Sequence, residues 1–557
     1  MNRNSESRFA INPTNIDIQR STFDRSTQLK TTFNTGELIP IYVDEVLPGD
    51  TFKMDTACVI RMSTPIHPVM DNCNLDTYFF FVPNRLVWEH WKEFNGENNT
   101  TAWEQETEYE IPQITSPTST GFTKGSIADY MGIPIGIPNL SVNHLPFRAY
   151  TLIWNDWFRD QNLHDPAYIN LDETTIAGSN GSTYQTDAQK GGKPLPVNKY
   201  HDYFTSALPQ PQKGPSVLLP LGDNAEVQVF GTGKTLGLTD GTKTGAINAY
   251  GSSGEIYGNN AINQAAGTTV STNSNQFTTL KALGVSTDPA TSGLTGTANL
   301  QSATAATINQ LRQAFQIQKL YEKDARGGTR YIEIIKSHFG VTSPDARQQR
   351  PEYLGGKRIP INIAQVLQTS STDATSPQGN TAAFSLTADK DSSFTKSFTE
   401  HGYIIGVACV RTEHTYQQGL ERLWNRKRRF DFYWPALANI GEQAILNKEI
   451  YAQGTTADDE AFGYQEAWAE YRYKPSRVSG ALRSTYAQSL DVWHYGDDYE
   501  SQPILSDTWL RETKVNMDRT LAVQSELEDQ FIADFYFKNE CTRAMPLYSI
   551  PGLIDHH

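Results

Sequence analysis

The sequence has few of the residues that mark an exported, disulfide-bonded or membrane protein. Its 557 residues include only four cysteines, Cys58, Cys73, Cys409 and Cys541, which stand far apart and lack the CxxC spacing of zinc sites. No run approaches the roughly 18 to 20 apolar residues that a membrane helix needs. The N-terminus also has no apolar core of signal-peptide length. These absences predict buried, reduced thiols and a product made in the cytoplasm, with no membrane insertion.

An excess of positive charge is also missing. The chain has 47 Lys and Arg against 62 Asp and Glu, for a formal net charge of −15, whereas free-standing nucleic-acid binders usually have a basic footprint. The charge is unevenly spread, because residues 311–360 hold ten Lys and Arg against five Asp and Glu, and residues 455–534 hold seven against sixteen. One surface can therefore be basic while another is acidic.

No catalytic or metal-binding motif is present. The sequence has no HExxH or GxSxG pattern, and its eleven histidines are scattered. Asp71, Asn72, Asn74 and Asp76 could offer oxygens to calcium, but their order is not that of an EF-hand, so a solvated turn is the simpler interpretation. The acidic residues at 458–460 and 497–498 are likewise expected to be solvated loop charges. We expect no enzymatic activity and no cofactor.

Aromatic residues, by contrast, are plentiful at 11% of the chain, and they are densest in residues 62–91, MSTPIHPVMDNCNLDTYFFFVPNRLVWEHW. Residues 77–82 have the bulk and branching that favour strands, without the alternation of a sheet that has one wet face. This predicts a strand covered on both faces. Pro83 and Asn84 end the strand, and a helix is predicted next from apolar residues at roughly helical spacing, Leu86, Val87, Trp88, Trp91 and Phe94.

Other strands are expected in the first 75 residues and near the C-terminus. TQLKTTFN, LIPIYVDEV and TFKMDTACVIRM read as strands, with the last two separated by a Leu-Pro-Gly-Asp turn at 47–50. Isoleucines alternate at 359, 361 and 363, and buried strands are predicted at 402–411 and 531–546. Short strands separated by turns suggest a sandwich or barrel.

Two helical regions are expected between these strands. Tyr150, Ile153, Trp154, Trp157 and Phe158 mark one apolar face of a helix predicted at 147–163. A second helical region begins near residue 306, is interrupted by two glycines at 327–328, and resumes from 331 to 338.

Composition changes sharply at residues 222–306. These 85 residues hold 13 Gly, no Arg or Trp, and only four aromatic residues, Phe230, Tyr250, Tyr257 and Phe277. Short β-prone pieces recur between glycine-rich turns, which favours a folded surface excursion over a plain linker. A second, smaller polar stretch covers residues 370–393.

One cluster combines positive charge with aromatic rings. Arg422, Arg426, Lys427, Arg428 and Arg429 are interleaved with or followed by Trp424, Phe430, Phe432, Tyr433 and Trp434. Single-stranded nucleic acid needs charge for its phosphates and flat faces for its bases, so this is a candidate DNA-binding site. The alternative is a basic edge at a subunit interface. A second candidate patch consists of Arg326, Arg330, Arg347, Arg350, Lys357 and Arg358.

Several long runs resemble one known family. They are STFDRS (21–26), LIPIYVDEVLPGDTFK (38–53), the aromatic run at 62–91, YHDYFTSALPQPQKGP (200–215), ARGGTRYIEIIKSHFGVTSPDARQQRPEYLGG (325–356) and TYQQGLERLWNRKRRFDFYWPALANIGEQAI (415–445). In order and rough spacing they resemble the major capsid proteins of the Microviridae, small icosahedral single-stranded DNA bacteriophages, and most closely the gokushovirus branch. The segment 222–306 resembles nothing that can be matched residue by residue.

This resemblance implies a mainly β fold, an eight-stranded antiparallel jelly roll of the viral capsid type with long loop insertions and a few peripheral helices. Residues 1–221 and 307–557 would form the discontinuous jelly-roll domain, and 222–306 a surface insertion that projects at threefold axes. Sixty copies would close into a T=1 shell around circular single-stranded DNA, located in the virion and assembled in the host cytoplasm.

The resemblance also implies partners. These are other copies of the chain, the single-stranded DNA genome, a small basic DNA-packaging protein, an internal scaffolding protein, a minor pilot protein, and a host cell-surface receptor. The four aromatic residues of 222–306 are candidates for host attachment. Trp88 and Trp91 are candidates for packing between subunits.

Without the resemblance, the composition would suit a soluble β-rich glycan-binding adhesin or a glycoside hydrolase. A hydrolase needs two carboxylates held across a cleft, and no such pair can be identified from the sequence. An adhesin predicts an export signal or a repeat array, and neither is present.

Overall fold

The computed structural model describes residues 19–97, 108–217, 308–342, 344, 349–370, 372 and 377–548, together with seven short strands between residues 227 and 298. The chain divides into two compact units, Met1–Lys213 with Glu322–His557, and Gly214–Tyr321. The insertion predicted at 222–306 falls within the second unit. Its strands pair antiparallel as β10–β16, β12–β11–β15 and β13–β14. Their bounds are β10 Val227–Gly231, β11 Gly237–Thr239, β12 Thr244–Ala246, β13 Val270–Thr272, β14 Asn275–Phe277, β15 Ala282–Gly284 and β16 Leu294–Ala298.

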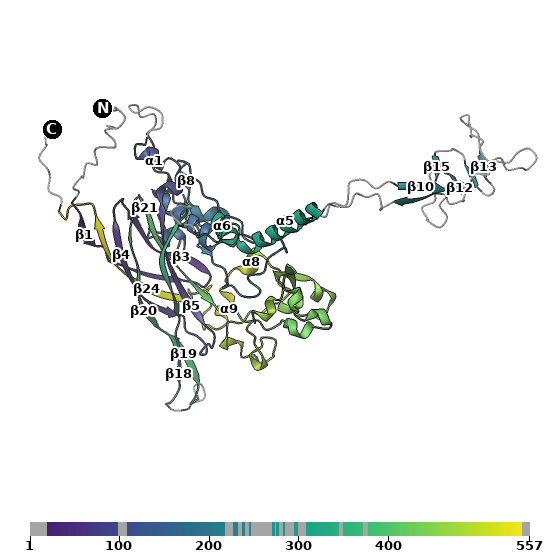
Figure 1. Ribbon diagram of the computed structural model, residues 1–557. Helices are drawn as coiled ribbons and strands as arrows, with labels where there is room; N and C mark the ends of the chain where they lie inside the picture. Colours follow the sequence, from purple (N-terminus) through teal and green to yellow (C-terminus); the bar gives the residue numbers. More distant parts are fainter. Residues whose placement is uncertain are drawn as a thin grey trace, which may run out of the picture. The chain divides into compact units, whose positions relative to one another are not determined.

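The first unit contains two large antiparallel sheets (Figure 1). The first sheet consists of β1 (Ser21–Asp24), β2 (Thr27–Phe33), β4 (Thr51–Met62), β20 (Thr387–Ser397) and β24 (Phe531–Arg543). The last strand, β24, lies inside this sheet, because it pairs with β1 and β2 along one edge and with β4 along the other. Burial alternates along β4 and β24, so one face of the sheet is covered and the other is exposed.

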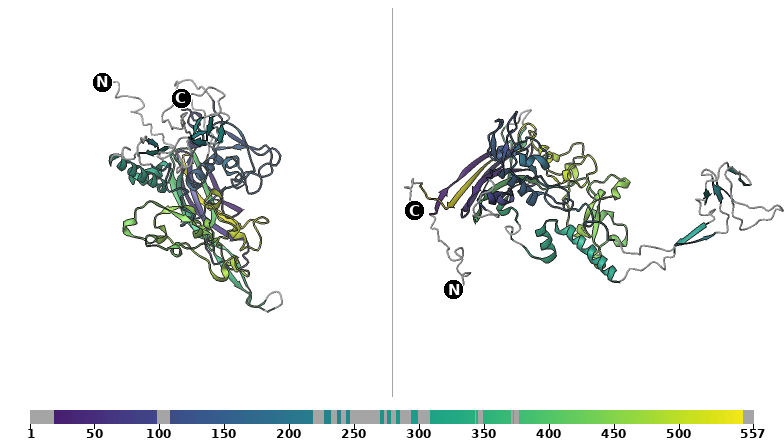
Figure 2. Two further views of the ribbon diagram at one scale, coloured as in Figure 1. Left: turned by 90° about the vertical axis from the view of Figure 1, so that its right-hand side faces the viewer. Right: turned by 90° about the horizontal axis from the view of Figure 1, so that it is seen from above.

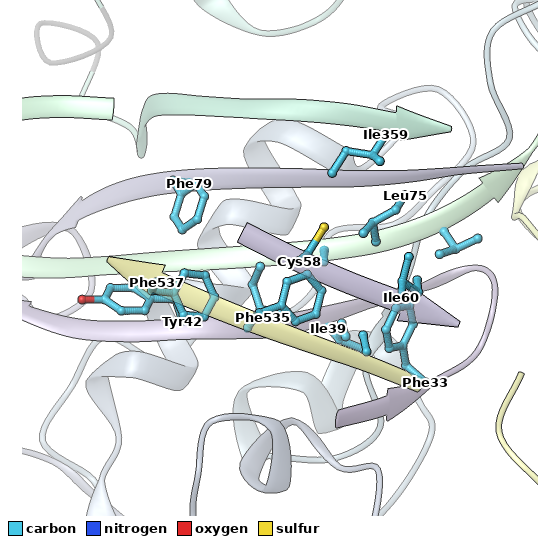
Figure 3. Close-up of a cluster of buried hydrophobic side chains, with 14 of the residues drawn as sticks. Phe33, Ile39, Tyr42, Cys58, Ile60, Leu75, Phe79, Ile359, Phe535 and Phe537 are labelled. Atoms are coloured by element: carbon cyan, nitrogen blue, oxygen red, sulfur yellow. The ribbon is translucent and has the colours of Figure 1, made fainter. Parts of the chain in front are cut away.

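The second sheet has the order β17–β5–β21–β3–β9. Its strands are β3 (Glu37–Val46), β5 (Cys73–Pro83), β9 (Leu195–Pro196), β17 (Glu352–Pro360) and β21 (Gly402–Thr412). One face of this sheet meets the covered face of the first sheet in a shared core, in which side chains of both sheets point toward one another (Figure 3). The ring centroids of Phe79 and Phe537 lie 6.2 Å apart, and those of Tyr42 and Phe537 lie 5.1 Å apart.

The other face of the second sheet is covered by a helical layer. Phe80 and Val82 of β5 pack there in one buried cluster with Phe147 and Tyr150 of α3 (Leu145–Ile153) and with Trp154. Every residue of β5 except half-buried Tyr78 is therefore buried. The prediction that the aromatic strand is covered on both faces is confirmed.

The predicted helices are confirmed in two cases and wrong in one. The helix predicted at 147–163 is α3, which continues as a π-helical turn, η3 (Trp154–Phe158), and stops there because Arg159 is extended. The helix α5 (Ile308–Gly327) ends before Gly328, whose φ is +90°, and α6 (Tyr331–Phe339) follows.

The continuous helix predicted after Pro83 is absent. The segment forms only a 3₁₀ turn, η2 (Asn84–Leu86), and one helical turn, α1 (Trp91–Phe94). Trp88 lies between them with its side chain fully buried, at ring-centroid distances of 6.2 Å from Trp91 and 5.3 Å from Phe94. Burial of this indole in the helical layer outweighs the local helical spacing.

The turn predicted at 47–50 and the predicted buried thiols are also confirmed. The N–H of Asp50 donates to the carbonyl of Leu47 at 3.0 Å, and Gly49 has a φ of +88°. All four cysteines are unbonded and buried. Burial raises the pKa of the Cys58 thiol to about 11, which keeps it protonated.

The remaining elements connect the sheets. Three small sheets are β7–β6–β8, β18–β19 and β22–β23. Their strands are β6 Gln113–Thr115, β7 Ser141–Asn143, β8 Ile176–Ala177, β18 Ile363–Leu367, β19 Thr381–Ser385, β22 Glu442–Leu446 and β23 Ala461–Glu466; the short helices are α2 Ile127–Tyr130, α4 Tyr184–Asp187, α7 Asn447–Ile450, α8 Asp507–Leu510 and α9 Val515–Asp518. The isoleucine alternation at 359–363 spans two strands, because β17 ends at Pro360 and β18 begins at Ile363.

Candidate nucleic-acid interface

The basic and aromatic cluster lies in the long connection between β21 and β24, residues 413–530. Figure 2 shows this connection, coloured green to yellow, outside both large sheets. It consists of loops, short helices and the small sheet β22–β23. A small core of its own holds it together, in which Phe204, Tyr416 and Phe462 pack with Ile445 and Ile450. The rings of Phe204 and Tyr416 lie 4.7 Å apart. This core supports residues 422–434, here called the basic–aromatic loop.

Within the basic–aromatic loop, one carboxylate organises the backbone. Oδ2 of Asp431 accepts the backbone N–H groups of Lys427 and Arg428, both at 2.7 Å. These two hydrogen bonds lower the pKa of Asp431, which stays ionised. The loop thereby keeps a turn conformation without a regular helix or strand, with 3₁₀ turns at η6 (Arg422–Asn425) and η7 (Arg429–Asp431).

Two of the five cations are engaged inside the chain. Arg422 donates to the carbonyl of Ala444 at 2.8 Å and lies 3.3 Å from the carboxylate of Glu449. Arg426 pairs with Glu470 at 3.1 Å, and only 9% of its side chain is exposed. Their positive charge is largely compensated by these acids, so both arginines primarily anchor the loop.

The other three cations, Lys427, Arg428 and Arg429, are exposed. Within the parts of the chain that the structure describes, none of them forms an ion pair. The guanidinium of Arg429 lies 4.8 Å from the ring centroid of Trp434. Trp424 and Phe430 expose 68% and 70% of their surface. Cations without an ion pair and open aromatic faces therefore lie in one short loop, as binding of single-stranded nucleic acid requires.

The second basic patch predicted from the sequence is mostly neutralised. Arg330 pairs with Glu333 at 3.2 Å, Lys357 with Asp389 at 2.6 Å, and Arg358 with Asp76 at 2.9 Å, while Arg326 pairs with Glu442 and Glu466. The guanidinium of Arg350 lies 4.1 Å from the ring centroid of Trp157. Arg347 lies outside the described residues. The basic–aromatic loop is therefore the stronger candidate for binding a polyanion.

The prediction of a solvated turn at residues 71–76 is wrong for Asn74 and Asp76, which both belong to β5 and are buried. Asp76 is only 1% exposed. Its carboxylate accepts from Nε of Arg358 at 2.9 Å, from Nε of Arg411 at 3.1 Å and from the hydroxyl of Tyr200 at 2.8 Å. The partners are distant in sequence, so no local pattern signals the pairing.

The prediction of solvated charges is also wrong for Asp458, which is buried and accepts the backbone N–H of Gln453 at 2.9 Å, and for Asp497. Asp497 is buried and accepts from Nδ1 of His414 at 2.9 Å and from Nζ of Lys199 at 3.1 Å. The other imidazole nitrogen of His414, Nε2, lies 2.9 Å from the carboxylate of Glu512. Burial alone would lower the pKa of His414, but the carboxylates of Glu512 and Asp497 raise it to about 10. The imidazole is thus a buried cation that joins three distant parts of the chain.

Of the residues predicted to contact neighbouring subunits or a host, the structure describes four and leaves two outside the described residues. Trp88 is fully buried within its own chain, and Trp91 is half-buried beside it, so only Trp91 offers surface to a neighbour in this conformation. Phe230 lies in β10 and Phe277 in β14, whereas Tyr250 and Tyr257 lie outside the described residues. Their roles stay predictions.

In the described segments, no helix is both long and apolar enough to cross a membrane. The same segments contain no group of three or more His, Cys, Asp or Glu side chains arranged to hold a metal ion.

Comparison with known proteins gives consistent matches over nearly the whole chain. The family model described as "Capsid protein (F protein)" matches residues 12–553. The chain is 45% identical over 555 residues to "Capsid protein VP1" of Bdellovibrio phage phiMH2K, covering 99% of this chain and 98% of the relative. It is 40% identical over 593 residues to "Capsid protein VP1" of Chlamydia phage 1, covering 98% of each. It is 45% identical over 541 residues to "Capsid protein VP1" of Spiroplasma virus 4, covering 94% of this chain and 93% of the relative.

Proposed function

Because the chain belongs to the capsid protein (F protein) family, it is a structural protein of the virion capsid, and we propose that sixty copies close into a T=1 shell around circular single-stranded DNA. The resemblance to gokushovirus capsid proteins is confirmed. The role is structural rather than enzymatic, which sets aside the adhesin and glycoside hydrolase alternatives.

The order of the strands supports an eight-stranded jelly roll. β1 and β2 pair with successive parts of β24, at Ser21↔Arg543 and Thr27↔Phe537, and so act as one interrupted strand. Counted this way, four strands in the order β1/β2–β24–β4–β20 face four in the order β17–β5–β21–β3, with β9 as a short addition. Chain neighbours such as β4 and β5 then lie in opposite sheets, as in the double Greek key of viral capsid domains.

Particle formation is the direct test of the shell. The full chain, expressed with and without an internal scaffolding protein, should sediment as particles or as pentamer-like intermediates, and electron micrographs should show closed shells. A product that stays a small species under both conditions would contradict the proposal. A minor pilot protein is a further proposed partner during assembly.

For the genome, the proposed contact is through Lys427, Arg428 and Arg429. The net charge of −15 implies that only local basic surfaces face the DNA, and a small basic DNA-packaging protein would neutralise the remaining phosphates. What supports this interface is the combination of three cations without ion pairs in the described chain and the open rings of Trp424 and Phe430 beside them.

Replacing Lys427, Arg428 and Arg429 by Gln should lower affinity for single-stranded DNA and flatten its salt dependence by about two units of log K against log salt, since each phosphate contact contributes about 0.7. Packaged DNA per particle should also fall. The matched control replaces Lys30, Lys53 and Lys538, which are also exposed but paired with Asp534 or Glu540. If both variants lose the same affinity, the basic–aromatic loop has no special role; if neither does, the loop is structural.

Host attachment through the insertion 222–306 is the second proposal for the surface. Gly231 of β10 and Leu294 of β16 are paired neighbours, so residues 232–293 can be replaced by a two-residue turn that keeps this hairpin closed. The shortened chain should form particles of normal sedimentation that fail to adsorb to cells. Normal adsorption would refute attachment through the insertion.

A further inference from the structure

A cavity of about 590 Å³ opens beside the basic–aromatic loop. Its lining includes Arg426 and Phe432 of the loop, and Tyr471, Tyr473 and Arg477 of the following segment. The volume lies within the range of about 300 to 1,000 Å³ that is usual for sites of small organic groups. The cavity is thus large enough for a flat heterocycle and adjoins the exposed cations of the loop.

The walls of this cavity offer aromatic faces. The guanidinium of Arg426 lies 4.3 Å from the ring centroid of Tyr471 and 5.4 Å from that of Phe432, so charge and rings are already stacked. Tyr473 exposes 56% of its surface. No ring partner for Tyr473 occurs among the described residues. One aromatic face therefore remains open for a further planar group.

The same walls carry hydrogen-bonding groups that are not all satisfied. The side chain of Arg426 is more than nine-tenths buried, yet its Nε finds no hydrogen-bond partner in the described parts of the chain. A buried donor without an acceptor is costly, so this position favours a ligand that brings one. Glu421 and Glu470, which also line the cavity, supply acceptors. A nucleobase has a flat ring and an edge with hydrogen-bond donors and acceptors. The cavity therefore suits a nucleobase better than a purely apolar ligand.

We propose that this cavity takes up one unstacked base of the packaged single-stranded DNA, while the flanking phosphates contact Lys427, Arg428 and Arg429. The inference rests on the DNA contact proposed above and adds to it a site for the base itself. Three exposed cations without ion pairs in the described chain lie between the lining residues Arg426 and Phe432 in the sequence, which favours a polyanion over a peptide segment as the occupant. Stacking on an aromatic side chain strengthens binding of each base by roughly tenfold.

The test compares two oligonucleotides of equal length and charge, oligothymidylate and the same backbone without bases. Full-length, unassembled protein should bind oligothymidylate about tenfold more tightly in fluorescence anisotropy. Tyr473→Ser should remove most of this preference, whereas Tyr473→Phe, which keeps the ring, should retain it. The affinity for the base-free backbone should be the same in all three proteins.

The possible failures are distinguishable. If the wild type binds both oligonucleotides equally, the cavity takes no base, although the phosphate contact stands. If Tyr473→Ser keeps the full preference, the bases stack elsewhere, on Trp424 or Phe430, and the cavity inference is overturned. If Tyr473→Ser binds normally but no longer assembles, the cavity belongs to a subunit contact. If neither oligonucleotide binds the wild type, the proposed DNA interface fails as well.

Discussion

Replacing His414 by glutamine removes a buried cation without removing much volume. His414 is held between the carboxylates of Asp497 and Glu512, at 2.9 Å from each. Among the residues that the structure describes, Lys199 then remains as the one cation paired with Asp497, and Glu512 loses the imidazolium that contacts it. Breaking a buried ion pair by removing one partner typically costs about 3 to 5 kcal/mol. We expect the variant to lose that much unfolding free energy at neutral pH.

The pH dependence gives a sharper expectation. Folding raises the pKa of His414 from 6.5 to about 10, so the folded state binds the proton more tightly than the unfolded state. The stability from this group is therefore fully present below pH 6.5 and is lost as the pH rises toward 10. Over that window the loss is about 1.4 kcal/mol per pH unit.

Urea unfolding of the full chain at pH 6.5, 8 and 9.5, followed by tryptophan fluorescence, measures this slope. The wild type should lose stability with rising pH more steeply than His414→Gln, by about 1.4 kcal/mol per unit. His201→Gln is the matched control, because His201 is exposed, and it should follow the wild type. Parallel curves for the wild type and His414→Gln would refute the assignment of a buried imidazolium.

Three further substitutions test the core, an acid-sensitive histidine and one backbone position. Phe79→Ala should cost about 3 to 5 kcal/mol in urea unfolding, because this ring is fully buried between the sheets, whereas exposed Phe430→Ala should cost less than about 0.5. Burial and a neighbouring arginine lower the pKa of His144 to about 4. The wild type should therefore lose stability as the pH falls from 6.5 to 4, and His144→Gln should lose less. Equal dependence of unfolding on acid pH in the two proteins would contradict this. Gly36→Ala should destabilise more than Gly96→Ala: both have positive φ, but only at Gly36 would the new Cβ meet a backbone carbonyl oxygen, at 2.4 Å.

The strands could be predicted because their signals are local. In β4 and β24 the alternation of buried and exposed positions follows directly from the period of a strand, and the unbroken apolar run of β5 correctly indicated two covered faces. The pairing could not be predicted in the same way. Residues of β1 and β24 that are partners, such as Ser21 and Arg543, are more than 500 positions apart.

The errors share one physical cause, which is that tertiary contacts outweigh local pattern. In the sequence, Asp76 and Asp497 have the local pattern of solvated turn residues. Their arginine, lysine and histidine partners come from distant segments, so burial of the two carboxylates depends on the tertiary fold. Trp88 has helical spacing, but its burial in the helical layer breaks the helix. For the basic–aromatic loop the sequence indicated the right residues and could not show that Arg422 and Arg426 are engaged by Glu449 and Glu470.

The position of β24 has a consequence for synthesis of the chain. This strand, Phe531–Arg543, joins β1 and β2 to β4, so the first sheet has a gap until β24 has left the ribosome. A chain truncated before residue 531 cannot complete this sheet and leaves the edges of β2 and β4 unpaired, which favours aggregation. The shared core can therefore form fully only after a segment made about 500 residues later than β1 is available. A shell that admits only subunits with a complete first sheet would exclude chains truncated before β24 without any separate proofreading factor.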